Sequence, residues 1–464
     1  MSLPRLLACV WLLAAAVHAQ AQRLPPEVDA ALARAKLPRD AITLLVVDAD
    51  GRSQPRVDHR STVPVNPASI AKLSTSIAAL ELLGPAFTWS TPVYVDGPIV
   101  NGTLQGNLYI KGQGDPKLVL ERLWLLMRRV QGLGIRAISG DIVLDRGAFE
   151  VPAQDPGAFD GEPLRPYNAA PDALLLNYKS IVMTFTPQGS QAAVQIDPPL
   201  AGVQYPLTVP LATGECGDWR GGLKADFADA SRVRFAGAYP ASCGERVWPI
   251  AYADGRSYAT RAVAGMWQQI GGTLAGQARE GRVPAQLVPA FEVQSPTLAE
   301  VIRDMNKYSN NVIAQQLFLT LSLQQRGVGT FEGSREVMRK WWRERLAGEP
   351  PVMVNGSGLA RDERITAQEL ARLLQLAWAS PSMPELMSSL PVSGVDGTMR
   401  RVRGKGAGLA HLKTGSLRDV SGVAGYVHGA SGRRYVMVAI ANHPQAYLAR
   451  PAIEALIEWT AKDQ

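Results

Sequence analysis

The chain has 464 residues, of which 46% are hydrophobic and 19% are charged, and its formal net charge is +7. This composition is typical of a globular protein with room for two or three domains, and it argues against an intrinsically disordered chain. The positive charge is not accompanied by an aromatic-basic motif, so it is weak evidence for nucleic-acid binding. A basic surface equally suits an anionic polymer or a lipid headgroup surface.

Residues 1–21 match a secretory signal peptide. Arg5 supplies the positive charge, residues 6–17 form an apolar segment, and small residues such as Ala19 and Ala21 offer a cleavage site. A retained anchor is the weaker alternative, because the apolar segment is short for a membrane span and no later stretch is long and apolar enough. We therefore expect an exported protein.

Two cysteines remain once Cys9 has left with the signal peptide. They are Cys216 and Cys243, and a single pair in an exported chain predicts one disulfide. Two buried thiols are the alternative. No cluster of further ligands lies near them and the histidines have no metal-ligand spacing, so we expect no metal site.

Two strands and a helix are predicted at the start of the mature chain. Residues 41–48 are an apolar strand-like run, and the Asp50-Gly51 dipeptide is a hairpin signal that leads to a second strand before residue 61. Residues 67–83 then have helical periodicity, with one apolar face made by Ile70, Leu73, Ile77 and Leu80.

Residues 91–291 have a different character, with short strand-like runs between Gly- and Pro-containing turns. One helix is expected there, at residues 116–130. We interpret this region as a β-rich insert made of two nested subdomains. The predicted strands are residues 91–95, 103–111, 137–144, 181–186, 193–196 and 232–235.

Helical periodicity returns at Leu298 and continues to about residue 379, with Thr366 as the cap of one helix. Three strands are predicted after that, at residues 410–417, 423–427 and 435–441, and an amphipathic helix closes the chain. Sheet-forming segments at both ends predict one domain, residues 22–90 and 292–464, which the insert at 91–291 splits.

Ser69 and Lys72 form a Ser-x-x-Lys motif in the first turn of the helix at residues 67–83. Their spacing lets the amine reach the hydroxyl, and unpaired N–H groups and the positive end of the helix face the same place. This is the arrangement that acyl transfer needs, provided that burial beside another cation keeps the amine neutral. The alternative for the motif alone is an ordinary helix-capping serine.

Two further short motifs follow in the chain. Ser309 and Asn311, in a loop between two helices, place a hydroxyl that can relay a proton beside an amide that can hold a substrate amide. Lys413 and Thr414 lie on a strand and present a charge and a hydroxyl to a carboxylate, and Gly415 allows close backbone approach. Each motif alone has a plain structural explanation, as a helix boundary or a strand edge.

The order Ser-x-x-Lys, Ser-x-Asn, Lys-Thr-Gly is the signature of penicillin-binding proteins and related β-lactamases. With its export signal and long insert, the chain resembles the low-molecular-mass class C penicillin-binding proteins, the D-alanyl-D-alanine carboxypeptidase/endopeptidase family. Residues 112–116, 355–359 and 394–398 also match that family. The resemblance implies an α/β fold of the α+β type, in which an antiparallel sheet flanked by helices carries the site.

The resemblance also implies roles for individual residues. Ser69 would be the nucleophile and Lys72 its base, while Ser309 and Lys413 would return a proton to the leaving amine. Asn311 would hold the peptide amide. The substrate-binding residues would be Thr414, Gly415 and Ser416, with the N–H groups of Ser69 and Ser416 as oxyanion hole.

The implied substrates are peptidoglycan stem peptides in the periplasm, with β-lactams as covalent inhibitors of Ser69. No cofactor is implied, and contact with the cell wall or a membrane surface fits the basic charge. The alternatives are a β-lactamase or esterase of the same fold, and a non-catalytic cell-wall-binding protein. Tyr308 also opens a Tyr-x-Asn pattern, but we favour the Ser309–Asn311 register because residues 311–314 continue as the family's loop-to-helix segment does.

Overall fold

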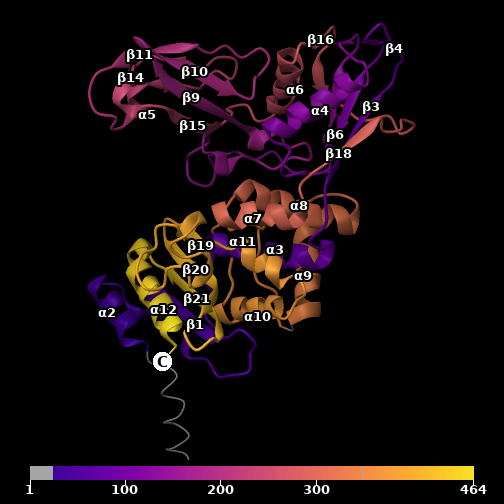
Figure 1. Ribbon diagram of the computed structural model, residues 1–464. Helices are drawn as coiled ribbons and strands as arrows, with labels where there is room; N and C mark the ends of the chain where they lie inside the picture. The colour runs from indigo at the N-terminus through magenta and orange to yellow at the C-terminus, as the bar shows by residue number, and fades with distance from the viewer. Residues whose placement is uncertain (1–23, 347, 464) are drawn as a thin grey trace, which may run out of the picture. The chain divides into compact units, whose positions relative to one another are not determined.

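The computed structural model describes residues 24–346 and 348–463 and divides the chain into two compact units (Figure 1). The first unit comprises the residues up to Phe87, Thr297–Leu321 and the residues from Phe331 onward. The second unit comprises Thr88–Pro296 and Ser322–Thr330. The expected signal peptide, residues 1–21, lies outside the described residues.

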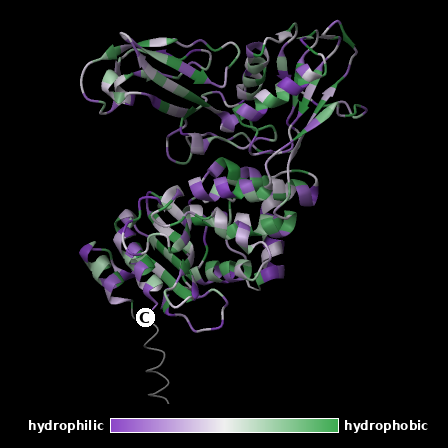
Figure 2. Ribbon diagram, in the orientation of Figure 1, coloured by the Kyte–Doolittle hydropathy of each residue, from purple (hydrophilic) through white to green (hydrophobic). Residues whose placement is uncertain are grey.

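An antiparallel five-stranded sheet forms the centre of the first unit, with strand order β19-β20-β21-β1-β2. β1 is buried at all seven positions, as its apolar sequence predicts, and pairs with β21 from the far end of the chain. The strands of this sheet are largely hydrophobic in Figure 2. The strands are β1 (Ile42–Asp48), β2 (Val57–His59), β19 (Ala410–Leu417), β20 (Val420–His428) and β21 (Arg434–Asn442).

Helices cover both faces of this sheet. α2 (Pro26–Arg34) and α12 (Arg450–Lys462) pack together with the sheet in one apolar core, while α10 (Ala367–Trp378) packs on β1 and β21 (Figure 1). Thr366 caps α10 in a reciprocal pair with Glu369, as expected from the sequence. The other helices are α3 (Lys72–Leu83), α7 (Leu298–Tyr308), α8 (Asn311–Arg326), α9 (Phe331–Leu346) and α11 (Met383–Ser389). The short 3₁₀ turns include η1 (Arg39–Ala41), η2 (Ala68–Ala71), η6 (Gly397–Met399) and η7 (Ala446–Ala449).

Several short sheets make up the second unit. One has the strand order β17-β8-β6-β3-β18, another β16-β7-β5-β4, a third β14-β11-β10-β9-β15, and β12 pairs with β13. The strands are β3 (Ser90–Val95), β4 (Ile99–Val100), β5 (Thr103–Leu104), β6 (Leu108–Lys111), β7 (Ala137–Ile138), β8 (Ile142–Asp145), β9 (Ser180–Gln188), β10 (Gln191–Asp197), β11 (Thr208–Ala212), β12 (Ala225–Asp226), β13 (Arg234–Phe235), β14 (Tyr239–Pro240), β15 (Arg246–Ala251), β16 (Thr273–Leu274), β17 (Ala278–Glu280) and β18 (Phe291–Gln294).

The expectation of a single helix in this region is wrong. Besides α4 (Leu120–Gly132) and the short α5 (Trp219–Gly222), the second unit contains α6 (Tyr258–Gln269). Four of the eight buried residues of α6 are small, namely Ala259, Ala262, Ala264 and Gly265. These residues weaken the apolar periodicity by which a helix is recognised in a sequence.

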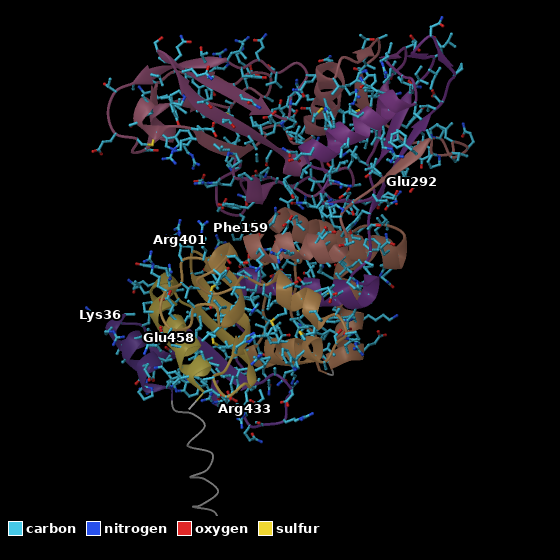
Figure 3. All side chains as sticks on the ribbon, viewed as in Figure 1. Lys36, Phe159, Glu292, Arg401, Arg433 and Glu458 are labelled. Carbon is cyan, nitrogen blue, oxygen red and sulfur yellow. A yellow bond between two sulfur atoms is a disulfide. The ribbon has the colours of Figure 1, made fainter. Side chains whose placement is uncertain are left out.

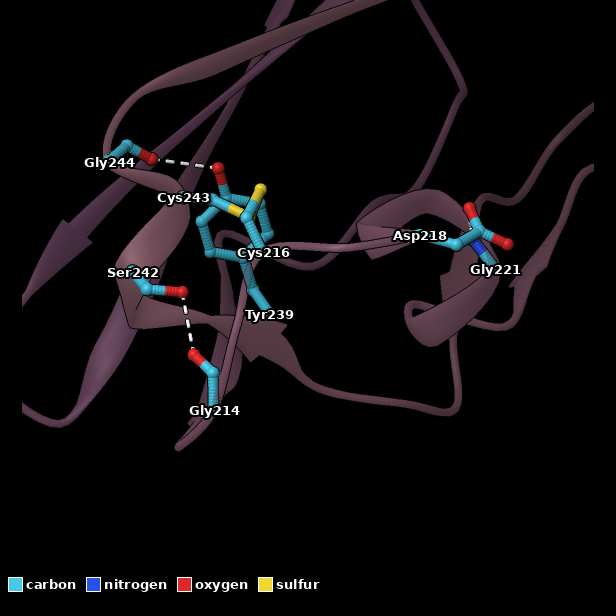
Figure 4. The surroundings of a disulfide bond; sticks show 8 residues. All are labelled: Gly214, Cys216, Asp218, Gly221, Tyr239, Ser242, Cys243 and Gly244. Carbon is cyan, nitrogen blue, oxygen red and sulfur yellow. Dashed lines mark hydrogen bonds between the residues drawn. A yellow bond between two sulfur atoms is a disulfide. The ribbon is translucent and has the colours of Figure 1, made fainter.

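Cys216 and Cys243 form a disulfide in the second unit, with an S–S distance of 2.12 Å (Figure 4). Beside it, the hydroxyl of Tyr239 donates to the carbonyl of Gly244 at 2.8 Å. The ring of Tyr239 stacks on Phe185, with centroids 5.5 Å apart. The bridge therefore fixes two chain segments against a small aromatic core.

The predicted fold class, an α+β protein with an antiparallel sheet between helices, is confirmed by this architecture. Among the described residues, no helix combines the length and the apolar character that a membrane crossing requires.

Candidate active site

Ser69 lies in the 3₁₀ turn η2, which runs directly into α3. Asn66 shapes this turn: its side-chain oxygen accepts from the N–H of Ala68 at 2.8 Å, and its amide donates to the carbonyl of Ala360 at 2.9 Å. Ala68 has a φ of +48°, a left-handed conformation that costs an alanine about 1–2 kcal/mol. The buried Asn66 side chain stabilises that turn and so fixes where the Ser69 hydroxyl points.

Two glycines allow neighbouring segments to contact η2. A Cβ at Gly415 on β19 would lie 2.5 Å from the carbonyl oxygen of Pro67, and a Cβ at Gly358 would lie 1.9 Å from that of Ala68. A side chain at either position would push the neighbouring backbone away. The glycine of the Lys-Thr-Gly motif is therefore needed for packing, because it allows strand β19 to lie against the turn that carries Ser69.

Lys72 is completely buried at the start of α3. Its Nζ lies 2.8 Å from Ser69 Oγ and 2.7 Å from Asn311 Oδ1, and it also donates to the carbonyl of Ser357. Burial, reinforced by the charge of Lys413, lowers the pKa of Lys72 well below its usual range, while the carboxylate of Glu363 opposes that shift. A lowered pKa increases the fraction of the amine that is neutral, and a neutral amine can accept a proton from Ser69.

Ser309 and Asn311 lie at the junction of α7 and α8, and their side chains reach the two lysines. Ser309 ends α7 with a φ of +57°, and its hydroxyl accepts from Lys413 Nζ at 2.9 Å. Asn310 instead accepts from the N–H of Ile313 at 3.0 Å, at the first turn of α8. Tyr308 is 73% exposed. This geometry favours the register that places Ser309 and Asn311, and not Tyr308, beside Ser69.

Lys413 is completely buried on β19, where it also donates to the carbonyl of Thr414 at 2.7 Å. Burial lowers its pKa to about 7. The hydroxyl of Thr414 is bonded to that of Thr398 at 2.8 Å, and Ser416 is exposed at the end of the strand. Thr414 and Ser416 line the same cavity as Ser69 and Ser309.

Glu363 is a further buried ionisable residue near Lys72. The sequence around it does not indicate that this carboxyl is buried. Its side chain is 1% exposed, and one carboxylate oxygen accepts from the N–H of Val354 at 3.0 Å. The other oxygen has no partner among the described residues. Burial raises the pKa of Glu363 to about 7, against the opposing effect of the backbone N–H groups of Val354 and Asn355. The site thus holds three buried ionisable groups with shifted pKa values.

A cavity of about 730 Å³ opens in front of these groups. Its lining begins at Ser69 and Ser309 and extends over β19, β20, the loop around η6 and the start of α12. Among the described residues, His, Cys, Asp and Glu side chains form no group of three or more that could hold a metal ion. The hydroxyls of Ser69 and Ser309 line this cavity, and each accepts a hydrogen bond from a buried lysine amine.

Comparisons with known proteins agree with this geometry. A sequence model described as the D-Ala-D-Ala carboxypeptidase 3 (S13) family matches residues 24–463. A D-alanyl-D-alanine carboxypeptidase DacB from Haemophilus influenzae is 24% identical over 422 residues, 88% of this chain and 86% of that protein. A D-alanyl-D-alanine carboxypeptidase from Actinomadura sp. (strain R39) is 28% identical over 390 residues, 79% of this chain and 71% of that protein.

The solved structure of penicillin binding protein 4 from Haemophilus influenzae has the same fold, with a TM-score of 0.73 at 22% sequence identity. The superposition covers 94% of this chain and 100% of the chain in that structure. That protein has also been solved in complex with a β-lactam.

Proposed function

Because the chain belongs to the D-Ala-D-Ala carboxypeptidase 3 (S13) family and is a serine D-alanyl-D-alanine carboxypeptidase/endopeptidase, we propose that Ser69 performs its reaction through an acyl-enzyme. The observation that carries this proposal is the position of Lys72 Nζ, 2.8 Å from Ser69 Oγ and buried so that its amine can be neutral. A hydroxyl that donates its proton to such an amine becomes a nucleophile.

Acylation begins when the Ser69 oxygen attacks the carbonyl carbon of the penultimate D-alanine and its proton passes to Lys72. The N–H groups of Ser69 and Ser416 stabilise the oxyanion that forms, a contribution that is typically about 3 kcal/mol for one such donor. The amide of Asn311, held by Lys72 at 2.7 Å, faces the peptide amide of the substrate. The C–N bond then breaks, and an ester links the substrate to Ser69.

The leaving amine takes a proton from Ser309, which recovers one from Lys413. The contact of 2.9 Å between Lys413 Nζ and Ser309 Oγ supports this relay, as does the pKa of about 7 for Lys413, because a group with that pKa gives and takes protons near neutral pH. Thr414 binds the terminal carboxylate of the substrate. Water then attacks the ester carbonyl and gives a proton through Ser309 to Lys413, while Lys72 returns its proton to the Ser69 oxygen as the ester bond breaks. The shortened peptide and free Ser69 are released, and both lysines regain their starting protonation.

The substrate is a peptidoglycan stem peptide, and β-lactams acylate the same serine. The relative from Haemophilus influenzae that was solved with a β-lactam supports this second statement. We place the reaction in the periplasm, where the substrate lies, and residues 1–21 would direct the chain there. A β-lactamase of the same fold would instead release the opened β-lactam quickly, and a wall-binding protein would not need Ser69.

Release of D-alanine from a synthetic pentapeptide that ends in D-Ala-D-Ala tests the proposal. We expect the wild-type protein to release one D-alanine per peptide, and Ser69→Ala and Lys72→Ala to lower kcat by a factor of about 10³ or more. Tyr308→Phe serves as the control, because this side chain is exposed at the end of α7, next to Ser309 in the chain. Equal activity of Ser69→Ala and wild type would refute the assignment of the nucleophile.

A further inference from the structure

The cavity in front of Ser69 continues past the residues that the proposed reaction uses. Beyond Thr414 and its partner Thr398, the lining passes to Arg400 and Arg401 on the loop after η6, and to Arg450 at the start of α12. Figure 3 labels Arg401 on this loop. Three arginines therefore line the cavity that holds the nucleophile.

These arginines do not have equal freedom to bind a ligand. Arg450 is paired with Glu454 at 2.8 Å and also donates to the carbonyl of Arg401 at 3.2 Å, which ties α12 to the loop. Arg400 and Arg401 are exposed, and within residues 24–346 and 348–463 neither has an ion-pair partner. Their charges are therefore available to an anion that enters the cavity.

The same cavity also has apolar lining residues. They are Met399 and Val402 of the loop, Val423 of β20, and Ile453 and Ile457 of α12. A lining that combines apolar and cationic side chains fits a peptide that carries both aliphatic carbons and carboxylates. A single D-alanine is far smaller than the space of about 730 Å³ that the whole cavity offers.

The orientation of the bound substrate in the proposed reaction decides which part of it reaches Arg400 and Arg401. The acyl group is attached to Ser69, and the terminal carboxylate of a pentapeptide is held at Thr414. Arg400 and Arg401 follow Thr398, the partner of Thr414, closely in the chain and line the same cavity, and we therefore assign them to the side of the leaving group. When the enzyme cuts a cross-link between two stem peptides, the leaving group is a second peptide with several carboxylates.

We propose that Arg400 and Arg401 form a leaving-side subsite that binds the carboxylates of the second stem peptide in a cross-link. The inference rests on the proposed function, because it needs the acyl-enzyme on Ser69 to define the two sides. In the cleavage, Ser69 forms its ester with the D-alanine carbonyl, the cross-link amide breaks, and the amine of the second peptide leaves with the relayed proton. The two arginines hold that peptide while the bond is cut.

The test compares two substrates that deliver the same acyl group to Ser69, a pentapeptide monomer and a cross-linked muropeptide dimer. Because kcat/KM reports steps through acylation, the ratio of the two values isolates the leaving group. We expect the double variant R400A/R401A to lower kcat/KM for the dimer relative to the monomer by about tenfold, mainly through KM. The double variant R400K/R401K should recover most of the loss, and added salt should weaken dimer cleavage more than monomer cleavage.

Arg403 and Lys405 provide a matched control. Both lie on the same loop and carry the same charge, but neither lines the cavity. R403A/K405A should leave the ratio of the two kcat/KM values unchanged. An equal change in this control would mean that the general positive field, and no built subsite, attracts the dimer, and it would overturn the inference.

Other outcomes separate the inference from the function on which it rests. A wild-type protein that trims the monomer but does not cut the dimer, or an R400A/R401A variant with an unchanged ratio, would overturn the subsite and leave the acyl-enzyme intact. A wild-type protein that acts on neither substrate and takes no penicillin on Ser69 would overturn both.

Discussion

Replacing Glu363 with glutamine should make the free energy of unfolding less dependent on pH. The carboxyl of Glu363 is 1% exposed, and burial raises its pKa from an ordinary 4.5 to about 7. Between these two values the unfolded chain loses the proton and the folded protein keeps it. The folded state therefore loses stability as pH rises through this window.

The size of the effect follows from the two pKa values. At about 1.4 kcal/mol per pH unit, the interval from 4.5 to about 7 corresponds to about 3 kcal/mol. Glutamine cannot titrate, so the difference in unfolding free energy between E363Q and wild type should grow in favour of the variant by about 3 kcal/mol between pH 4.5 and pH 8. Urea unfolding followed by tryptophan fluorescence at several pH values measures this difference.

The same variant should also change the pH dependence of acylation. The ionised carboxylate of Glu363 raises the pKa of Lys72, so its removal should lower that pKa and leave more of the amine neutral at and above about pH 7, where Glu363 ionises. The acidic limb of the benzylpenicillin acylation rate should move to lower pH. Glu349→Gln, an exposed carboxylate on a neighbouring segment, is the control and should change neither quantity. The reasoning would be refuted if the unfolding free energies of E363Q and wild type changed with pH by the same amount. It would also be refuted if the acidic limb of the acylation rate moved to higher pH.

Three further variants test other parts of the structure. Asn66→Ala should lower the unfolding free energy by about 3 kcal/mol in urea titrations, because three side-chain hydrogen bonds are lost; a loss no larger than that of the exposed Thr62→Ala would contradict it. Tyr308→Phe should acylate with benzylpenicillin within twofold of wild type, since this ring is 73% exposed, and a hundredfold loss would contradict the Ser309 assignment. Removal of the disulfide in a C216S/C243S double variant should lower the melting temperature by several degrees, at a cost of about 3–4 kcal/mol for a loop of 27 residues, with no change in the acylation rate. An unchanged melting temperature would show that the bridge adds no stability.

Local patterns in the sequence predicted the elements that carry the reaction. The spacing of Ser69 and Lys72 places both side chains on adjacent turns whatever the rest of the chain does. The apolar run of β1 and the capping pair that starts α10 are equally local, and the structure confirms both elements.

Contacts between distant segments could not be predicted in this way. Glu363 looks like an ordinary surface carboxylate within a charged stretch, and only the packing of residues 354–363 behind Lys72 buries it. Asn66 likewise acts through Ala360, almost three hundred residues away. The sequence predicts one strand over residues 103–111, but a bend at Gln105 and Gly106 divides them into β5 and β6.

The central claim is that Ser69, activated by Lys72, forms a covalent acyl-enzyme. Mass spectrometry of the intact mature protein after brief exposure to benzylpenicillin, followed by peptide mapping, tests it most directly. We predict one adduct per chain, located on Ser69, stable for minutes or longer and absent from Ser69→Ala. An adduct on another residue, or none at all in the wild-type protein, would contradict the account, and an adduct that clears at once while penicillin is consumed would identify a β-lactamase.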